Sequence, residues 1–393
     1  MVHNMKKRTF AILGSTGSIG KSSLSVINKL KKTKVELIFA NKNFKEILNQ
    51  IKIFKPKVIV VNSCKTFKKL KKNKFQNKKI IILNDYKQSK KYLKKIDVTI
   101  SAIPGINGLE PTIFFTGISK KVLIANKESI ICGWNLIKAK AKRFNTKLIP
   151  IDSEHFSINF LLKNYSPDQI NKIYITASGG PFLHLDKSSF KKIKPNQAIK
   201  HPKWKMGKKI SVDSATLMNK VLEIIEAVKL FSINLNKFQI VVHPQSLIHC
   251  IVELKNGLRV FLYHEPDMKI PIFNAIEESD NLQNMFNFNN KKLSNTLTFF
   301  PVDKKKFPIA KVINKIDLNN SSPILINSVN EIFVDQFLKK KIKFTDIYKY
   351  LNRFLNSIEY IKTSKIKPNS IENVKKIDLI GRKIALKIIN NNV

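Results

Sequence analysis

A chain of 393 residues with 43% hydrophobic content is long for a single core and predicts two or three globular domains, without an apolar run long enough to span a membrane. Its three scattered cysteines, with no C-x-x-C pair, exclude a disulfide scaffold or a zinc ribbon and favour a reducing, cytoplasmic location. The net charge of +45 includes only five arginines among 72 basic residues, and the lysines follow the whole chain, so we expect no specific nucleic-acid partner.

The first 151 residues alternate strand-like and helix-like runs. This is the pattern of a mostly parallel, doubly wound sheet with helices on both faces. The expected strands are 9–13, 35–40, 58–61, 79–83, 98–103, 122–125 and 148–151. We therefore expect a Rossmann-like nucleotide-binding domain over residues 1–151.

A glycine-rich turn follows the first of these strands. Gly14, Gly17 and Gly20 lie in the segment GSTGSIG, and a helical pattern comes directly after it. A strand, such a turn and a helix N-terminus together form a cradle for pyrophosphate, because backbone N–H groups and the helix dipole face the anion. The spacing G-x-x-G-x-x-G differs from the usual dinucleotide fingerprint, which leaves a plain surface turn as the alternative.

The end of the second strand favours NADPH over NADH. An NAD enzyme normally places an acidic residue there for the ribose 2′-hydroxyl, whereas this chain has Asn41, Lys42 and Asn43. Lys42 can pair with a 2′-phosphate. Because lysine is abundant in this chain, the missing acid is the stronger of the two arguments.

Asn126, Lys127 and Glu128 follow the sixth expected strand and open a helix. Two interpretations stay open at this point. The polar cluster could contact a cofactor and a substrate, or it could cap the helix, with Asn126 as the cap and Glu128 in the first turn.

Carboxylates in two distant segments predict a metal site. Asp152 and Glu154 follow strand 148–151, at the strand end where open α/β sheets bind ligands. A helix from about residue 212 has one apolar face, made of Leu217, Val221, Ile224, Ile225 and Val228, and a polar stripe made of Thr216, Asn219, Lys220 and Glu223. An amide, an ammonium and a carboxylate on one stripe suit a phosphate beside a hard divalent cation.

The rest of the chain divides by pattern. Residues 152–278 mix the predicted helix with strands at 173–177, 239–243 and 258–264, which indicates an α+β catalytic domain for metal and substrate. Residues 279–305 read as a polar, Asn-rich connector, and residues 306–393 as a C-terminal helical bundle. The expected fold is therefore α/β, with an N-terminal Rossmann-like domain, an α+β domain and this bundle.

Two loops of the middle segment also carry polar groups. Ser178, followed by two glycines, can present a hydroxyl and backbone N–H groups to an anion, or form a plain turn. His201 and Trp204 lie in the segment HPKWKMG, which is typical of a lid that covers a substrate. We expect His243 and His249 to be satisfied polar groups of a core or an interface.

The segments GSTGSIG, ANKES, PIDSEH, SGGPF, HPKWKMG, KISVDSATLMNK and HPQS stand in this order along the chain. Together they resemble the 1-deoxy-D-xylulose 5-phosphate reductoisomerases, from about residue 8 into the C-terminal helices. The resemblance implies a homodimeric, NADPH- and metal-dependent enzyme of the non-mevalonate isoprenoid route. It would cleave and rejoin a C–C bond of this phosphorylated sugar and then reduce the aldehyde, giving 2-C-methyl-D-erythritol 4-phosphate.

The resemblance also implies residue roles. NADPH would be bound by Thr16, Gly17, Ser18, Ile19, Asn41, Lys42, Asn43, Asn126, Glu128 and Gly207. Asp152, Glu154 and Glu223 would ligate Mg²⁺, Mn²⁺ or Co²⁺. The substrate would be bound by Lys127, Ser153, Glu154, Ser178, His201, Trp204, Ser214, Asn219, Lys220 and Glu223. Catalytic roles would fall to Lys127, Asp152, Glu154, His201 and Glu223.

Three positions depart from the family pattern, since Asn41, Ala177 and Val221 stand where glycine is usual. None of them removes a chemical group. The competing interpretations are another metal- and NADP-dependent oxidoreductase, such as a β-hydroxyacid oxidative decarboxylase, a basic nucleic-acid-binding protein, and an enzyme that has drifted to inactivity. A decarboxylase of that kind needs arginines at its site, and the five arginines of this chain lie away from every candidate motif. A drifted, inactive enzyme would have lost site groups, and every candidate site group is present here.

Overall fold

The computed structural model describes residues 7–73, 75, 80–204, 206–278 and 296–391. The described residues form two compact units. Unit 1 falls within Met1–Ser129, Asn135–Phe156 and Asp267–Lys291, and unit 2 within Ile130–Trp134, Ser157–Pro266 and Lys292–Val393. Each unit has its own sheet and is described by itself.

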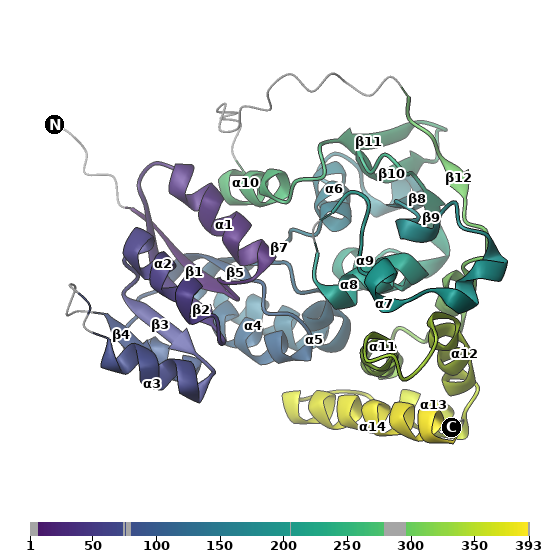
Figure 1. Cartoon of the computed structure of the whole chain (residues 1–393). Coiled ribbons are helices and arrows are strands. Elements are labelled where there is room, and N and C mark those ends of the chain that lie inside the picture. Colours follow the sequence, from purple (N-terminus) through teal and green to yellow (C-terminus); the bar gives the residue numbers. More distant parts are fainter. Residues whose placement is uncertain (1–6, 74, 76–79, 205, 279–295, 392–393) are drawn as a thin grey trace. The chain divides into compact units, whose positions relative to one another are not determined.

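Unit 1 is built on a seven-stranded parallel sheet of order β4-β3-β2-β1-β5-β6-β7 (Figure 1). The strands are β1 (Arg8–Leu13), β2 (Thr33–Ala40), β3 (Val58–Val61), β4 (Ile81–Leu83), β5 (Ile96–Ser101), β6 (Ser119–Ile124) and β7 (Lys147–Pro150). Each expected strand is confirmed within a few residues, although residue 79 lies outside the described part. Strand order reverses at β1, which pairs with both β2 and β5, so a ligand crevice is expected at their carboxyl ends.

Helices cover both faces of this sheet, as parallel strands require. They are α1 (Ser18–Lys29), α2 (Phe44–Phe54), α3 (Cys64–Lys72), α4 (Leu109–Thr116), α5 (Lys127–Phe144) and α10 (Lys269–Glu277). Phe10 and Ile12 of β1 pack into the core on one face. Ala11 and Leu13 pack on the other, because successive strand residues point to opposite sides.

Helix α10 belongs to unit 1, whereas the predicted catalytic segment ran through to residue 278. Its apolar residues Ile272, Phe273 and Ile276 join the core that also includes α1. An Arg8–Glu277 ion pair of 2.7 Å anchors its end. The chain thus returns to the first sheet through long-range packing that no local pattern reveals. The other boundaries stay predictions, and most of the expected connector lies outside the described residues.

Unit 2 has a mixed five-stranded sheet of order β11-β10-β8-β9-β12. The strands are β8 (Ile170–Ala177), β9 (Phe238–Val242), β10 (Ile248–Leu254), β11 (Arg259–Tyr263) and β12 (Phe300–Pro301). β8 pairs parallel with β9 and antiparallel with β10. Helices α6 (Ser153–Leu161), α7 (Pro195–Ala198), α8 (Lys208–Thr216) and α9 (Met218–Phe231) lie between the strands in sequence, with α6 beginning in unit 1.

The C-terminal part of unit 2 is helical, as predicted. It contains α11 (Ser322–Leu338), α12 (Phe344–Leu355), α13 (Ile358–Ser364) and α14 (Ile371–Asn390). Val329, Phe333 and Phe337 of α11 are buried, because residues spaced by four along a helix lie on one face. Short 3₁₀ turns lie at Tyr86–Lys91, Ile106–Gly108, Pro167–Gln169, Gly180–Phe182, Lys187–Lys192, Leu235–Lys237 and Pro308–Lys315.

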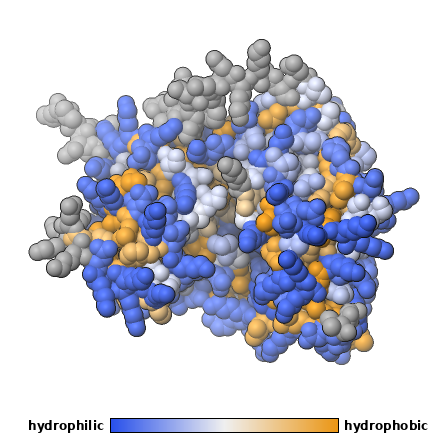
Figure 2. All heavy atoms as spheres, in the orientation of Figure 1, coloured by the Kyte–Doolittle hydropathy of each residue, from blue (hydrophilic) through white to orange (hydrophobic). Residues whose placement is uncertain are grey.

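The surface of both units is rich in hydrophilic residues, which are spread over the face seen in Figure 2 and do not form a single stripe. Among the described helices, none is both long enough and apolar enough to cross a membrane.

Candidate active site

The glycine-rich turn adopts the expected strand–turn–helix arrangement. The N–H groups of Gly14 and Ser15 donate to Phe39 O at 2.8 and 3.0 Å, which fastens the turn to β2. Gly14 has φ +83°, and a Cβ there would lie 2.5 Å from Ala102 O, so only glycine fits. Gly17 caps α1 and is exposed with Ser18, so the N-terminus of this helix is open to solvent beyond the carboxyl end of β1.

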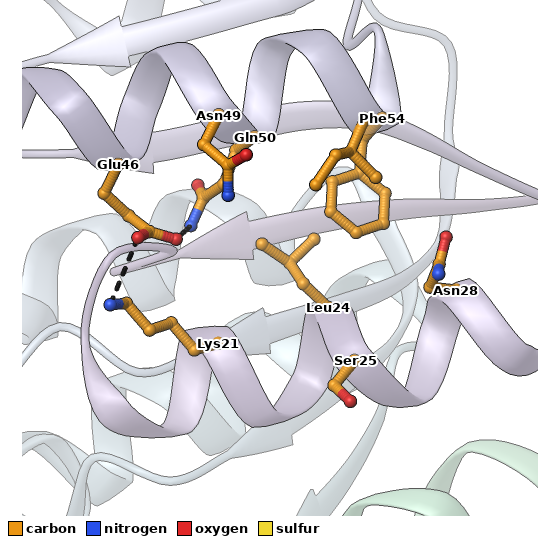
Figure 3. A pocket seen from close by; sticks show the side chains of 9 residues that line it. Lys21, Leu24, Ser25, Asn28, Glu46, Asn49, Gln50 and Phe54 are labelled. Carbon is orange, nitrogen blue, oxygen red and sulfur yellow. Dashed lines mark hydrogen bonds and ion pairs between the residues drawn. The ribbon is translucent and has the colours of Figure 1, made fainter.

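A side chain that the sequence analysis missed supports this turn. Gln50 of α2, only 2% exposed, donates from Nε2 to Ser15 O at 2.9 Å and to Glu46 Oε1 at 3.1 Å. Glu46 in turn pairs with Lys21 of α1 at 3.2 Å. These residues border a cavity of about 230 Å³ between α1 and α2 (Figure 3). No motif indicates Gln50, because its partner lies 35 residues away.

The segment after β2 is exposed and starts α2. Asn43 caps this helix, its side chain accepting from the N–H of Glu46 at 3.2 Å. Lys42 is held through its backbone, since its carbonyl accepts from Thr66 Oγ1 at 3.3 Å. Asn41 is not among the described residues with positive φ, so asparagine in place of glycine causes no left-handed strain there.

At the start of α5 the capping interpretation is confirmed. Asn126 is buried, and its Oδ1 accepts from the N–H of Ser129. Its Nδ2 donates to the carbonyls of Ile103 and Gly105, the latter at 3.0 Å. The Asn126 side chain therefore joins α5 to the loop after β5. Its contact with a cofactor stays a prediction.

Lys127 and the first carboxylates meet at the carboxyl ends of β6 and β7, which are neighbours in the sheet. The buried Lys127 Nζ lies 3.2 Å from Asp152 Oδ2. Ser153 Oγ donates to Glu154 Oε2 at 2.6 Å, and both residues are buried. Unit 1 thus presents two carboxylates beside one ammonium, a donor set of oxygens that suits Mg²⁺ or Mn²⁺.

In unit 2, Ser178 follows β8 and its hydroxyl position is fixed. His201 Nδ1 accepts from the N–H groups of Lys203 and Trp204, at 3.2 and 2.9 Å. Its proton therefore sits on Nε2, which donates to Ser178 Oγ at 3.0 Å. Ser178 Oγ also accepts from the N–H of Gly180 at 3.1 Å. With both of these bonds accepted, the serine proton is directed elsewhere, where it can donate to an anion.

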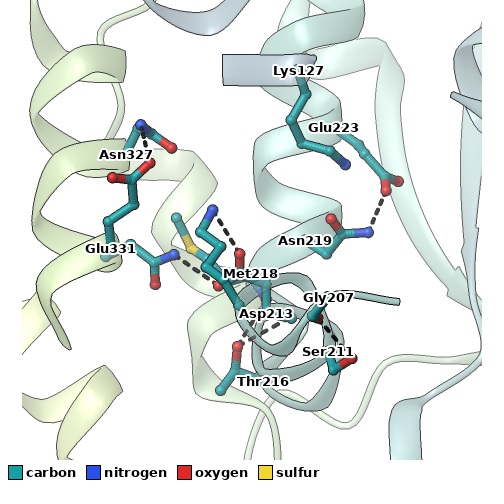
Figure 4. A network of polar contacts seen from close by, with 12 residues as sticks. Lys127, Gly207, Ser211, Asp213, Thr216, Met218, Asn219, Glu223, Asn327 and Glu331 are labelled. Atoms are coloured by element: carbon teal, nitrogen blue, oxygen red, sulfur yellow. Dashed lines mark hydrogen bonds and ion pairs between the residues drawn. The ribbon is translucent and has the colours of Figure 1, made fainter. Parts of the chain in front are cut away.

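The polar stripe expected on one long helix is divided between two helices. α8 ends at Thr216 and α9 begins at Met218, because Leu217 adopts φ +68° and ψ 7°. Thr216 is thus not on the α9 stripe, and the prediction for it was wrong. Its Oγ1 instead donates to Asp213 O at 3.1 Å and accepts from the N–H of Met218 at 3.3 Å (Figure 4).

The remaining three stripe residues do gather on α9, and all are buried. Lys220 Nζ lies 2.8 Å from Glu223 Oε2. Asn219 Nδ2 donates to Glu223 Oε1 (Figure 4). Glu223 itself is 1% exposed. Val221 is fully buried, as the helical wheel predicted, so its replacement of a glycine affects packing.

Two lid residues occupy different environments. The ring of Trp204 is half-buried and meets His249 edge-on, with centroids 6.0 Å apart. Gly207 caps α8 and is exposed, and a Cβ there would meet nothing within 4 Å. Its predicted cofactor role therefore rests on the backbone.

His243 is a satisfied buried group, as expected. Its Nε2 accepts from the N–H of Leu247 at 3.2 Å, so Nδ1 carries the proton and donates to Thr298 O at 2.9 Å. Burial lowers the pKa of His243, although the hydrogen bond to Thr298 opposes this. The ring stacks on Phe299 and remains neutral in this environment.

Comparison with known proteins gives one consistent family. Models of 1-deoxy-D-xylulose 5-phosphate reductoisomerase match residues 10–133, and models of its C-terminal domains match residues 148–231 and 264–384. A reductoisomerase of this name from Pelagibacter ubique is 43% identical over 97% of this chain and 99% of its own. One from a Wolbachia strain of Drosophila simulans is 39% identical, with 99% of both chains covered.

Solved structures agree. The reductoisomerase of Zymomonas mobilis in complex with NADPH is 33% identical and superposes with a TM-score of 0.87, covering 98% of this chain and 99% of its own. A reductoisomerase in complex with NADPH, fosmidomycin and magnesium is 30% identical, with a TM-score of 0.88 and 98% of both chains covered.

The hydrogen bonds of Asn126 predict a stability defect. Asn126→Ala should lower the free energy of unfolding by about 1–3 kcal/mol, because it removes a helix cap and leaves two carbonyls without their donor. Asn43→Ala, which removes only an exposed cap of α2, is the matched control and should cost about 1 kcal/mol or less. Urea unfolding measures both. An Asn126 variant no less stable than the control would contradict the structural role.

Proposed function

This chain belongs to the 1-deoxy-D-xylulose 5-phosphate reductoisomerase family, and from that membership we propose how its own residues carry out the family's reaction. The reaction is the NADPH-dependent isomerisation and reduction of 1-deoxy-D-xylulose 5-phosphate to 2-C-methyl-D-erythritol 4-phosphate, in the non-mevalonate route to isoprenoid precursors. Similarity over 97% of the chain carries this assignment. We place the reaction in the cytoplasm, where the free cysteines stay reduced.

The first unit binds NADPH. The exposed N-terminus of α1, at Gly17 and Ser18, suits the pyrophosphate, and Thr16 and Ile19 flank it in the turn. Lys42, exposed at the end of β2, pairs with the 2′-phosphate. Bound NADPH supplies the hydride. Two hydrogen bonds fix these segments to α2. Gln50 of α2 donates to Ser15 O in the glycine-rich turn, and Asn43 beside Lys42 accepts from the N–H of Glu46.

Three carboxylates hold the divalent cation. Asp152 and Glu154 follow β7 and Glu223 lies on α9, and their oxygen donors fit Mg²⁺, Mn²⁺ or Co²⁺. The bound cation acidifies the substrate hydroxyl and polarises its carbonyl. Lys127 lies beside Asp152, so its ammonium is placed to balance charge that develops on the substrate oxygens. Ser153 orients the carboxylate of Glu154 and contacts a substrate hydroxyl.

The second unit binds the phosphate of the substrate. Lys220 supplies the positive charge, and the hydroxyls and amides of Ser178, Ser214 and Asn219 donate hydrogen bonds. His201 keeps its proton on Nε2 and directs the Ser178 hydroxyl proton away from itself, toward the anion. Trp204, three residues after His201, covers the substrate and excludes water.

A second copy of the chain completes the enzyme through β11. Within the described residues this strand is an edge of the unit 2 sheet, and unpaired edges are ready to pair with another chain. Leu258 and Phe261 at this edge are 59% and 45% exposed. Exposed apolar side chains beside an unpaired edge favour a symmetric homodimer.

The cofactor preference follows from β2. Lys42→Asp should shift the ratio of kcat/KM for NADPH and NADH toward NADH by about tenfold or more, because a charge-assisted contact is replaced by repulsion. Lys45→Asp changes the same charge inside α2 and should leave the ratio unchanged. Steady-state kinetics with both cofactors measures this ratio. An unchanged ratio in the Lys42 variant would contradict the assignment of Lys42 to the 2′-phosphate.

The metal requirement gives the direct test of function. The enzyme should consume NADPH with 1-deoxy-D-xylulose 5-phosphate and Mn²⁺, and lose this activity with a chelator. Glu223→Gln should nearly abolish turnover and weaken Mn²⁺ binding, measured by calorimetry, because one of three anionic ligands is lost. Its affinity for NADPH should stay within about twofold, as for a defect confined to the metal site. A Glu223 variant that is active without metal would refute the proposal.

The dimer proposal predicts a monomeric variant. Phe261→Lys should halve the mass measured by light scattering, because a charge is placed in the apolar interface. Phe160→Lys is the matched control, since Phe160 on α6 is 39% exposed and lies away from β11 in sequence. A dimeric Phe261 variant, or a monomeric unmodified chain, would show that β11 is not the interface.

A further inference from the structure

Asp213 is a buried carboxylate to which the roles above assign nothing. It lies directly before Ser214 on α8 and is 1% exposed. One oxygen accepts from Asn330 Nδ2 and the other pairs with Lys209 Nζ, both at 2.8 Å (Figure 4). A buried charge is costly to desolvate, and removing one of its partners is strongly destabilising, so the groups that hold Asp213 matter to the fold around it.

We propose that Asp213 and Asn330 are positioning residues that fix Ser214, Asn219 and Lys220 for the substrate phosphate. This proposal rests on the phosphate site proposed above. The hydrogen bond between them joins α8, the helix that carries Ser214, to α11 in the helical part of unit 2.

The backbone between these residues needs such support. Leu217 has φ +68°, a region that residues with a Cβ rarely adopt, and it is buried. Strained backbone persists only where its surroundings over-determine it. Here the Leu217 N–H donates to Ser214 O at 3.1 Å, and Thr216 Oγ1 links Asp213 O to the N–H of Met218. Two of these three bonds are accepted by the backbone carbonyls of Asp213 and Ser214, so the turn is tied to the residues that the Asp213 side chain holds.

The far side of the pair is itself held. Asn330 is fully buried, and the next residue, Glu331, accepts from Arg382 of α14 and from Asn327 at 3.3 Å. Arg382 also bonds to Asp378 at 2.7 Å. Asn330 Oδ1 has no hydrogen-bond partner within the described residues. The Asn330 side chain therefore acts there as a donor, through its hydrogen bond to Asp213. Helices α11 and α14 therefore act as a fixed support for the α8–α9 turn.

If the pair is purely structural, its loss should lower the free energy of unfolding without a selective effect on any one ligand. Loss of a positioning pair also weakens phosphate binding selectively. Ser214 and Lys220 then lose their common geometry, whereas the NADPH contacts proposed at the α1 turn and at Lys42 lie in unit 1. The discriminating readouts are the KM for 1-deoxy-D-xylulose 5-phosphate and the inhibition constant of inorganic phosphate. The reference readout is the Kd for NADPH.

Asn330→Leu should raise the KM and the phosphate inhibition constant by about tenfold, the loss of one buried charge-assisted hydrogen bond, with the NADPH Kd within about twofold. Asn330→Ser, which removes the amide and leaves room for water, should act in the same direction and serves if the leucine variant does not fold. Gln336→Leu removes another buried amide from α11 and should change neither phosphate readout.

Exchange of the pair provides a rescue. Asn330→Asp alone places two carboxylates together and should be the most defective variant. Adding Asp213→Asn restores one donor opposite one acceptor and should recover part of the loss, a coupling measured by the double-mutant cycle. Absence of any recovery, or phosphate constants unchanged in both Asn330→Leu and Asn330→Ser, would overturn the proposal.

Ser214→Ala separates this inference from the assignment beneath it. If Ser214→Ala leaves the phosphate constants unchanged, the phosphate site itself is misplaced. If Ser214→Ala weakens phosphate binding while the Asn330 variants do not, the site stands and the positioning role is wrong.

Discussion

The left-handed backbone at Leu217 is the constraint on which the second half of the site depends. It ends α8 and starts α9 within one residue, so Ser214 in the last turn of one helix is followed at once by Asn219 and Lys220 in the first turn of the next. A continuous helix would give these groups a different order around its axis. The strain is stored where ligand contacts are proposed, and a buried network of side chains from α11 and α14 restrains it.

The carboxylates proposed to hold the metal are the second constraint, and Asp152 and Glu223 each have a lysine beside them. Lys127 accompanies Asp152 in unit 1, and Lys220 accompanies Glu223 in unit 2. An unpaired buried carboxylate would be costly, so these lysines let the fold form before any metal binds. In the proposed site, a bound divalent cation would supply this balance, and the ammonium groups would then be available to a phosphate or to a developing oxyanion. On this proposal, charge neutralisation links the metal-binding residues to the substrate-binding residues.

The features that depend on a local sequence pattern could be predicted from the sequence. Parallel strands buried on both faces read as short apolar runs, and the glycine-rich turn, Asp152 and Glu154 follow such runs directly. The break at Leu217 was not predictable, because apolar periodicity continues across it and leucine gives no turn signal. Gln50, Asp213 and α10 were missed for a different reason. Their partners lie far away in the chain, and only tertiary packing brings them together.

The loop that carries His201 links the local fold to the proposed phosphate site through one side chain. The backbone of Lys203 and Trp204 donates to His201 Nδ1, so this loop conformation itself selects the neutral imidazole with its proton on Nε2. That tautomer donates to Ser178, whose own proton must then point to a further acceptor. A loop opened at Trp204 would lose the donors to Nδ1, and with them the constraint that keeps the ring proton on Nε2. Loop conformation, the imidazole tautomer and the donor character of Ser178 are thus linked, and an anion that accepts from Ser178 favours the arrangement described.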